Sequence, residues 1–144
     1  MISILDANSM KLAGKWLLII LFVVVVFFII YFGVKKVKKD NEEKSYQNEL
    51  DKQINPSKLT HTELEFKSMA EMLYTAMKGP GTDEKAIYSV FEKLKTEDDY
   101  LKLCSAFGIR DNEKLGQWIT GDMNAGERKK LNNILSGNGI SAKF

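Results

Sequence analysis

An uninterrupted apolar run near the N-terminus is the strongest pattern in the chain. Residues 16–34 carry no charged side chain, and beyond a polar stretch the apolar residues recur every three or four positions in short blocks. As a helix rising 1.5 Å per residue, these 19 residues span about 28 Å, close to the ~30 Å hydrocarbon core of a bilayer. A single segment satisfies its backbone hydrogen bonds in lipid only as a helix, so the run predicts one transmembrane helix.

Interfacial side chains mark both ends of this span. Amphipathic rings favour the headgroup region, and lysine side chains next to the run can extend to water. The predicted membrane-interface residues are Trp16, Tyr31, Lys15, Lys35, Lys36, Lys38 and Lys39. A cleavable signal peptide is the competing interpretation, but its apolar region usually has ~7–15 residues and precedes a small-residue cleavage site, whereas two lysines follow this run.

The flanking lysines also predict the orientation of the span. Four lysines follow it, while Lys11 and Lys15 precede it. The positive-inside rule therefore predicts a single-pass protein whose C-terminal part lies on the cytoplasmic side, or on the capsid side or lumen of a virion membrane. The basic cluster can attract anionic lipid, at about 1 kcal/mol per lysine near the surface, or act only as a stop-transfer flank.

Composition divides the chain into five segments. They are an N-terminal flank (1–15), the transmembrane helix (16–34), a basic juxtamembrane segment and polar linker (35–59), a helical module (60–136) and a C-terminal tail (137–144). The first part of the linker can extend the membrane helix for a few turns, but Pro56 disfavours helical geometry at Asn55 and ends any continuation. The linker is therefore expected to act as a tether of adjustable reach.

Five amphipathic blocks predict an all-α module after the linker. A residue suited to helix capping opens each block: Thr62, Thr82, Thr96, Asp111 and Asn124. The apolar stripe of the first block is Phe66, Met69, Ala70, Leu73, Ala76 and Met77, and that of the second is Ile87, Val90, Phe91 and Leu94. The expected fold is all-α, with one transmembrane helix plus a small five-helix bundle.

Charge and composition limit the possible functions. Residues 40–144 hold 15 Lys/Arg against 18 Asp/Glu and lack the basic, aromatic-bearing stripe typical of nucleic-acid binding. The single cysteine, Cys104, lies on an apolar stripe and is expected in the core, and it excludes an intramolecular disulfide. Trp118 is expected to be a core anchor or an interaction hot spot.

Catalytic chemistry has little support in the sequence. The only histidine, His61, is distant from Cys104 in sequence and is expected to be solvated, and neighbouring Asp98 and Asp99 would point about 100° apart on a helix. No set of acid, base and nucleophile converges, so the chain is predicted not to be an enzyme. A cell-wall-acting enzyme would need a cleft that gathers Asp122, Glu127 and Arg110.

One loop carries a more specific motif. The segment Met77-Lys-Gly-Pro-Gly-Thr-Asp-Glu84, with Ile87 and a later Phe107-Gly-Ile-Arg-Asp111, resembles one annexin repeat over about residues 62–136. The resemblance is closer to the single annexin-like "GTDE" helical modules of bacterial and bacteriophage proteins. It implies an annexin-repeat-like bundle in a bacterial envelope or a phage membrane or virion.

The annexin resemblance also implies a candidate calcium loop. Annexins bind calcium through backbone carbonyls of this loop and a carboxylate from a later helix connection, and the positions carried over are Met77, Gly79, Gly81 and Asp122. The family spacing places the acid near Gly121, so Asp122 would serve through a one-residue shift, and only one repeat is present. The competing interpretation is structural, because the glycines permit a tight path and Asp83 and Glu84 suit a helix start.

These patterns favour a non-enzymatic, membrane-anchored structural or interaction protein. Its expected partners are the lipid bilayer and a protein or envelope or capsid component, without nucleic acid and without a required cofactor. A calcium-dependent phospholipid-binding module is the alternative. Residues 16–34 contain no small-xxx-small pattern, so any homo-oligomer is expected to form through the helical module.

Overall fold

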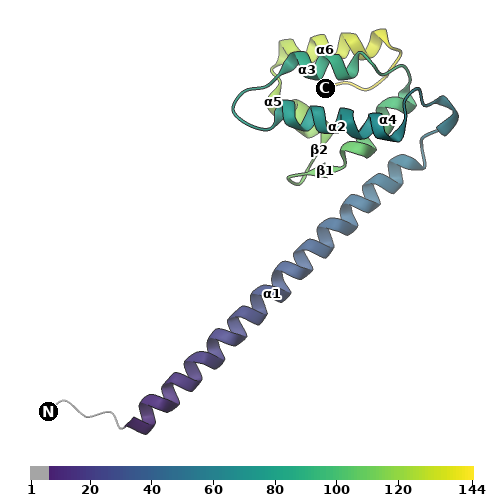
Figure 1. The fold of residues 1–144 in the computed structure, drawn as a ribbon. Coiled ribbons are helices and arrows are strands. Elements are labelled where there is room, and N and C mark those ends of the chain that lie inside the picture. Colours follow the sequence, from purple (N-terminus) through teal and green to yellow (C-terminus); the bar gives the residue numbers. More distant parts are fainter. Residues whose placement is uncertain (1–6) are drawn as a thin grey trace. The chain divides into compact units, whose positions relative to one another are not determined.

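The computed structural model of the protein describes residues 7–144 (Figure 1). Residues 1–6, part of the expected N-terminal flank, lie outside the described residues, as do the side chains of residues 7–14, including Lys11. The chain forms two compact units. The first extends to Glu42, and the second is Glu43–Phe144, called the module below.

Helix α1 (Ala7–Asp51) contains the predicted transmembrane span. The side chains from Trp16 to Val34 are all exposed, and none is buried against another part of the chain. Among the described residues this is the one helix long and apolar enough to cross a membrane, and it lies near the N-terminus. The helix extends beyond both ends of the predicted span, and the residues of α1 that follow Val34 are rich in lysine and glutamate, which are good helix formers.

The segment expected to be a free linker is partly helical and partly folded onto the module. Helix α1 continues to Asp51, and residues from Glu43 onward belong to the module. As expected before a proline, Asn55 is extended (φ −90°, ψ 108°), and Pro56 begins the short 3-10 helix η1 (Pro56–Lys58). Residues 43–59 are therefore an ordered part of the module rather than a tether.

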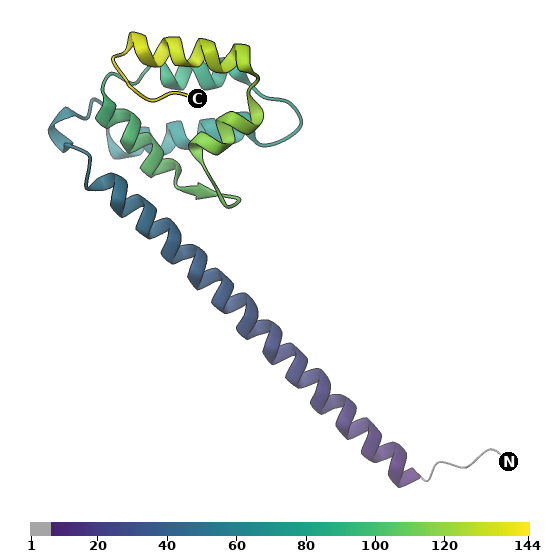
Figure 2. The same ribbon diagram turned by 180° about the vertical axis from the view of Figure 1, so that it is seen from behind.

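Five further helices build the module, which confirms the all-α prediction. They are α2 (Glu63–Met77), α3 (Glu84–Phe91), α4 (Glu97–Phe107), α5 (Leu115–Asp122) and α6 (Ala125–Gly137). In both ribbon views α3 and α6 form one layer, and α2, α4 and α5 form the other (Figures 1 and 2). The core lies between the layers, where the six residues predicted on α2 and the four predicted around α3 are all buried.

Three of the five predicted helix starts are confirmed. The Thr62 hydroxyl accepts the backbone N–H of Glu65, and the Glu65 carboxylate accepts the Thr62 amide in return, so the two residues form a capping box. The Thr96 hydroxyl caps α4, and Asn124 caps α6 in a second capping box with Glu127. At α3 the prediction of Thr82 is wrong, because the Asp83 carboxylate accepts the Ala86 amide instead.

The predicted start of α5 at Asp111 is also wrong, because a small hairpin precedes that helix. Strand β1 (Ile109–Arg110) pairs antiparallel with β2 (Glu113–Lys114), and α5 begins directly after β2. The two turn residues, Asp111 and Asn112, have φ of 50° and 69°. Two consecutive left-handed residues suit a two-residue hairpin turn, and Asp and Asn tolerate that conformation better than most residues.

The segment expected to be a C-terminal tail packs into the module. Ile140 is buried, and the Phe144 ring lies edge-on to Phe91 (6.1 Å) and Tyr100 (6.4 Å). The Asn132 side chain pairs with the backbone of Phe144, because its amide donates to the carbonyl and its oxygen accepts the N–H, both at 2.9 Å. In both ribbon views this segment runs between the two layers (Figures 1 and 2).

Candidate functional site

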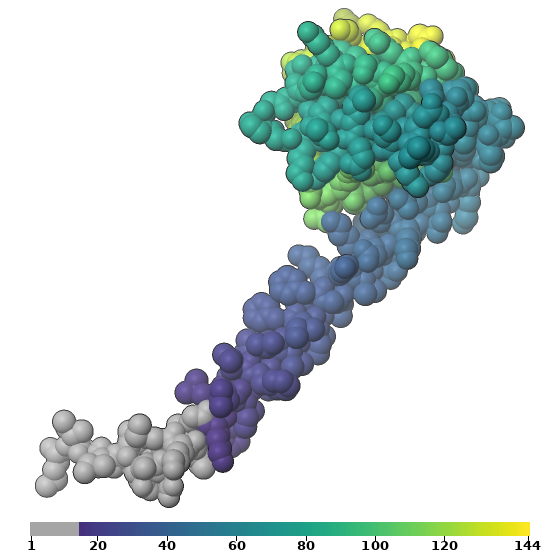
Figure 3. All heavy atoms as spheres, in the orientation of Figure 1, coloured from purple at the N-terminus to yellow at the C-terminus, as the bar shows by residue number. Residues whose placement is uncertain are grey.

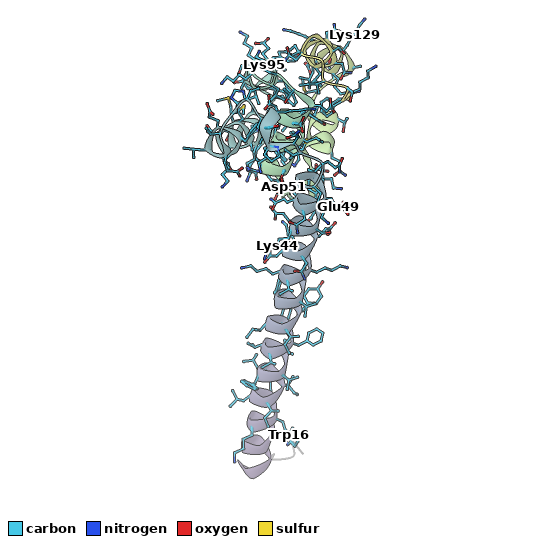
Figure 4. The ribbon with its side chains drawn as sticks, turned by 90° about the vertical axis from the view of Figure 1, so that its right-hand side faces the viewer. Trp16, Lys44, Glu49, Asp51, Lys95 and Lys129 are labelled. Atoms are coloured by element: carbon cyan, nitrogen blue, oxygen red, sulfur yellow. The ribbon has the colours of Figure 1, made fainter. Side chains whose placement is uncertain are left out.

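The predicted membrane-interface residues lie on α1, outside the module. Trp16 (labelled in Figure 4) and Tyr31 are 61% and 55% exposed, and the Tyr31 ring lies edge-on to its helix neighbour Phe32 at 5.7 Å. At 100° per residue, the lysines of the juxtamembrane cluster fall within an arc of about 160°. Val34 and Val37 lie outside that arc, so the helix just beyond the span has a basic side and an apolar side.

The candidate calcium loop connects α2 to α3 and protrudes from the module surface (Figure 3). Gly79 and Gly81 have φ of 129° and 91°, which residues with a Cβ rarely adopt, so the loop path requires both glycines. The Asp83 amide donates to the carbonyl of Ala76 (2.9 Å) and closes the loop. The predicted structural role of the glycines is confirmed. The Met77 side chain is buried, so only its backbone could act as a ligand.

Asp122, the carboxylate implied by the annexin resemblance, lies beside this loop. The Thr82 hydroxyl donates to the Asp122 carbonyl at 3.3 Å. One carboxylate oxygen, Oδ2, is shielded from solvent and has no hydrogen-bond partner among the described residues, and burial raises the pKa of this carboxyl. Within the same part of the chain, no group of three His, Cys, Asp or Glu side chains is close enough to bind a metal ion.

Trp118 is half-buried and holds the hairpin against α2. Its indole N–H donates to the Arg110 carbonyl (3.0 Å), and its ring lies edge-on to Tyr74 at 5.4 Å. The Arg110 guanidinium stacks over the Tyr74 ring at 4.7 Å and forms an ion pair with Glu71 at 2.7 Å. The Tyr74 hydroxyl donates to Asp111. Trp118 is therefore a half-buried anchor that packs against the core, as the core interpretation expects.

The sequence analysis missed the role of two buried carboxylates at the start of α4. Asp99 is fully buried and accepts hydrogen bonds from the Thr60 amide (2.8 Å), the Thr60 hydroxyl (2.7 Å) and the Lys95 amide (2.9 Å). Asp98 accepts the amide of Asn55 at 2.6 Å. Burial alone would raise the pKa of Asp99, but these donors outweigh it and hold that pKa below its usual range. Together the two aspartates fix residues 55–60 on the module.

Polar contacts also fix the end of α1 on α4. The Gln47 side chain donates to the Ser105 carbonyl (3.3 Å), and the Ser105 hydroxyl donates to Asp51 (2.9 Å). Lys102 lies 3.5 Å from Asp51 and 3.0 Å from Glu63, and it joins the end of α1 to the start of α2. Asp51, Glu49 and Lys44 mark this last part of α1 in Figure 4. In residues 43–51 the apolar signal for such packing is limited to Tyr46 and Leu50, which lie four positions apart on one face of the helix.

No protein-family model, curated protein or solved structure matches the chain.

Cys104 and His61 show no catalytic arrangement. Cys104 is buried as predicted, and burial raises the pKa of its thiol to about 12, so it stays protonated at neutral pH. His61 is more enclosed than expected: its Nε2 donates to the Lys93 carbonyl at 3.0 Å, and its ring packs edge-on against Phe66.

A cell-wall-acting enzyme would need Asp122, Glu127 and Arg110 together in one cleft. In the structure these three residues contact different partners. Arg110 pairs with Glu71, and Glu127 accepts the Asn124 amide as part of a helix cap. Asp122 lies beside Thr82 at the loop between α2 and α3. These contacts give the Arg110 and Glu127 side chains structural roles, whereas the contact of Asp122 is made by its backbone carbonyl.

Proposed function

We propose that the protein is a non-enzymatic, single-pass membrane protein that presents its helical module for binding to another protein at the bilayer. The observation that carries the proposal is the exposure of the whole apolar part of α1. Its large apolar side chains from Trp16 to Val34 are 36% to 69% exposed. Burial of each such side chain is worth ~1.5–3 kcal/mol, so this surface favours a lipid environment strongly.

The flanking charges support an orientation for this anchor. Four lysines follow the span within five residues, Lys35 to Lys39, and they are all exposed. The positive-inside rule then places the module on the cytoplasmic side of a cell membrane, or on the inner side of a virion membrane. The GTDE resemblance supports a bacterial envelope or a phage membrane as the setting, with an envelope or capsid protein as the partner.

Membrane extraction followed by protease digestion tests this function. The full chain should stay in the membrane fraction at alkaline pH, and its intact mass should show that residues 1–34 are retained. The module should resist protease in closed, right-side-out membranes and be digested once they are opened. A cleaved or alkali-soluble chain would exclude the anchor, and digestion in closed membranes would reverse the orientation.

Calcium-dependent phospholipid binding is the second candidate. The observation that favours it is the unpartnered Oδ2 of Asp122 next to the loop of Gly79 and Gly81. Ligands that bind only the folded state raise its stability, so calcium should raise the melting temperature of the full chain in detergent. Asp122→Asn should remove that shift, whereas Asp111→Asn on the hairpin turn should retain it. No calcium-dependent shift in the unsubstituted chain would exclude this candidate.

A further inference from the structure

The outer side of α2 is the most apolar exposed surface of the module. Among residues 43–144, the exposed large apolar side chains are Leu64 and Met72, at 77% and 39%. They lie eight residues apart on α2, with exposed Ser68 between them, so all three share one face of the helix. The two apolar side chains are about 12 Å apart along the helix axis. Helix α2 lies at the front of the module in Figure 1, and Figure 3 shows the same side with its heavy atoms as spheres.

A groove runs beside this stripe between α2 and α3. One end is lined by His61, Glu65, Ser68, Met69, Met72 and Lys93, and the other by Ser68, Glu71, Met72, Thr75, Ala76, Asp83 and Ala86. Ser68 and Met72 line both ends, so the two hollows are adjacent along α2. Methionine adapts its shape to different apolar partners, and small residues such as Ser68 let another backbone approach closely.

Carboxylates outnumber cationic side chains along the groove. Glu65, Glu71 and Asp83 are exposed and line it, while Lys93 and His61 lie together at one end. Glu71 also pairs with Arg110, but its side chain stays 66% exposed and can accept a further donor. An apolar stripe with acidic edges is complementary to an amphipathic segment with basic edges.

The same charges disfavour a second copy of the chain as the occupant. An antiparallel pair of α2 helices centred on Ser68 would place Leu64 opposite the partner's Met72, which suits both side chains. The pairing would also place Glu65 opposite the partner's Glu71, and Glu71 opposite the partner's Glu65. The glutamates that face each other would repel, which disfavours a dimer of two copies through α2.

We propose that this face of α2 binds a basic amphipathic helix of a different protein. Two apolar side chains about two turns apart on the partner pack against Leu64 and Met72, and its flanking lysine or arginine side chains meet Glu65, Glu71 and Asp83. The mode is that of a helix in a groove, with apolar anchors at i and i+7. The proposal rests on the function proposed above, because it names the surface through which the module binds its partner.

Methionine-methyl NMR of the full chain in phosphatidylcholine nanodiscs tests the proposal. Met72 is the reporter, and buried Met123 is the internal control. The probes are two 15-residue helical peptides with leucines at i and i+7, one carrying lysines and the other glutamates at the polar positions. The lysine peptide should shift the Met72 methyl signal saturably and leave Met123 in place, and the glutamate peptide should shift neither.

Two substitutions assign the shift to this face. Leu64→Ser should weaken binding of the lysine peptide about tenfold, since it removes one exposed apolar anchor. Glu71→Gln should weaken it roughly twofold to fivefold, as expected for one exposed charge pair, and should reduce its salt dependence. Glu49→Gln, the same chemical change on the end of α1, should leave the affinity unchanged; Glu49 is labelled in Figure 4.

Three outcomes would overturn the proposal. They are an unmoved Met72 signal, equal shifts with both peptides, and a Met72 shift that depends on protein concentration without peptide, which would identify a second copy as the occupant. None of these results would contradict the proposed membrane anchoring. Conversely, alkaline extraction of the chain would contradict the proposed function without changing the peptide result.

Discussion

The carboxylate of Asp99 binds both the backbone amide and the hydroxyl of Thr60, at 2.8 and 2.7 Å. The two residues are 39 positions apart, and the acceptor is fully buried. Because Thr60 lies just before α2, this contact fixes the segment that connects α1 to the rest of the module. A charged side chain that looked like an ordinary first-turn aspartate therefore joins distant parts of the fold.

Replacement of Asp99 should destabilise the module strongly. Asp99→Ala removes the acceptor for the Thr60 and Lys95 amides, and a buried donor left without a partner costs about 1–3 kcal/mol. We expect at least ~2 kcal/mol of lost unfolding free energy, measured by urea denaturation in detergent. The exposed Asp40→Ala should change it by less than ~0.5 kcal/mol. Equal stability of the two variants would show that the contact contributes little.

The same contact predicts a loss of stability in acid. The pKa of Asp99 is lower in the folded state than in the unfolded chain, where it is about 3.9. The stabilisation is therefore fully present above pH ~4 and is lost as the pH falls through the folded-state pKa. Urea denaturation gives the free energy of unfolding of the unsubstituted chain and of Asp99→Asn. The difference between the two should be smaller at pH 3 than at pH 7. A difference independent of pH would contradict this assignment.

The folding unit of the module should begin at Glu43 rather than at Thr60. A fragment of residues 60–144 lacks Leu50, which packs on the core, and the Asn55 amide that Asp98 binds. It should be less stable than a fragment of residues 43–144 by ~2 kcal/mol or more, since buried polar groups lose their partners. Thermal unfolding followed by circular dichroism compares the two fragments. Equal melting temperatures would restore residues 43–59 as a free linker.

Asn132 should stabilise the module through the segment that ends at Phe144. Its side chain makes two hydrogen bonds with the Phe144 backbone, so Asn132→Ala should cost about 1–2 kcal/mol. The neighbouring exposed Asn133→Ala is the matched control and should have little effect. Hydrogen exchange at residues 138–144 should accelerate only in Asn132→Ala. Unchanged exchange there would show that the aromatic contacts alone hold the segment.

The thiol of Cys104 should react slowly in the folded protein. Burial raises its pKa to about 12, and alkylating agents attack the thiolate. Labelling with iodoacetamide at pH 8 should therefore be at least tenfold slower in the native chain than in urea. Ser57→Cys in the exposed η1 provides a reactive control within a chain that also carries Cys104→Ala. Rapid native labelling of Cys104 would indicate frequent opening of α4.

The sequence predicts best the parts of the fold that depend on apolar periodicity. The stripe of α2, from Phe66 to Met77, is buried as predicted because one helix face packs against one core. The helix caps at Thr62 and Asn124 are local interactions, and the sequence predicts them too. The sequence does not predict the start of α5 correctly, because Asp111 suits a helix cap and a left-handed hairpin turn equally well. The pairing of β1 with β2 decides between the two.

Long-range polar contacts account for the other features of the fold that the sequence does not predict. Residues 43–59 read as a linker because they contain few apolar side chains, yet Gln47, Asp51 and Asn55 bind Ser105 and Asp98 on α4. Such pairs are 43 to 58 positions apart and leave no periodic pattern in the sequence. The nearness of Asp122 to the glycine loop was implied only by the annexin resemblance. Neither the candidate calcium site nor the proposed docking face of α2 follows from periodicity alone.

The fastening of α1 to α4 has a mechanical consequence. A pulling force on the backbone at Glu43 first acts on the contacts that hold the end of α1 on α4. These are the hydrogen bonds of Gln47 and Asp51 with Ser105, and the ion pair of Asp51 with Lys102. The contacts of Asn55 and Thr60 with the paired aspartates come next along the chain. Force applied at the N-terminal side of the module would therefore break the contacts of residues 43–60 with α4 before the contacts among the five helices, so this segment would yield first.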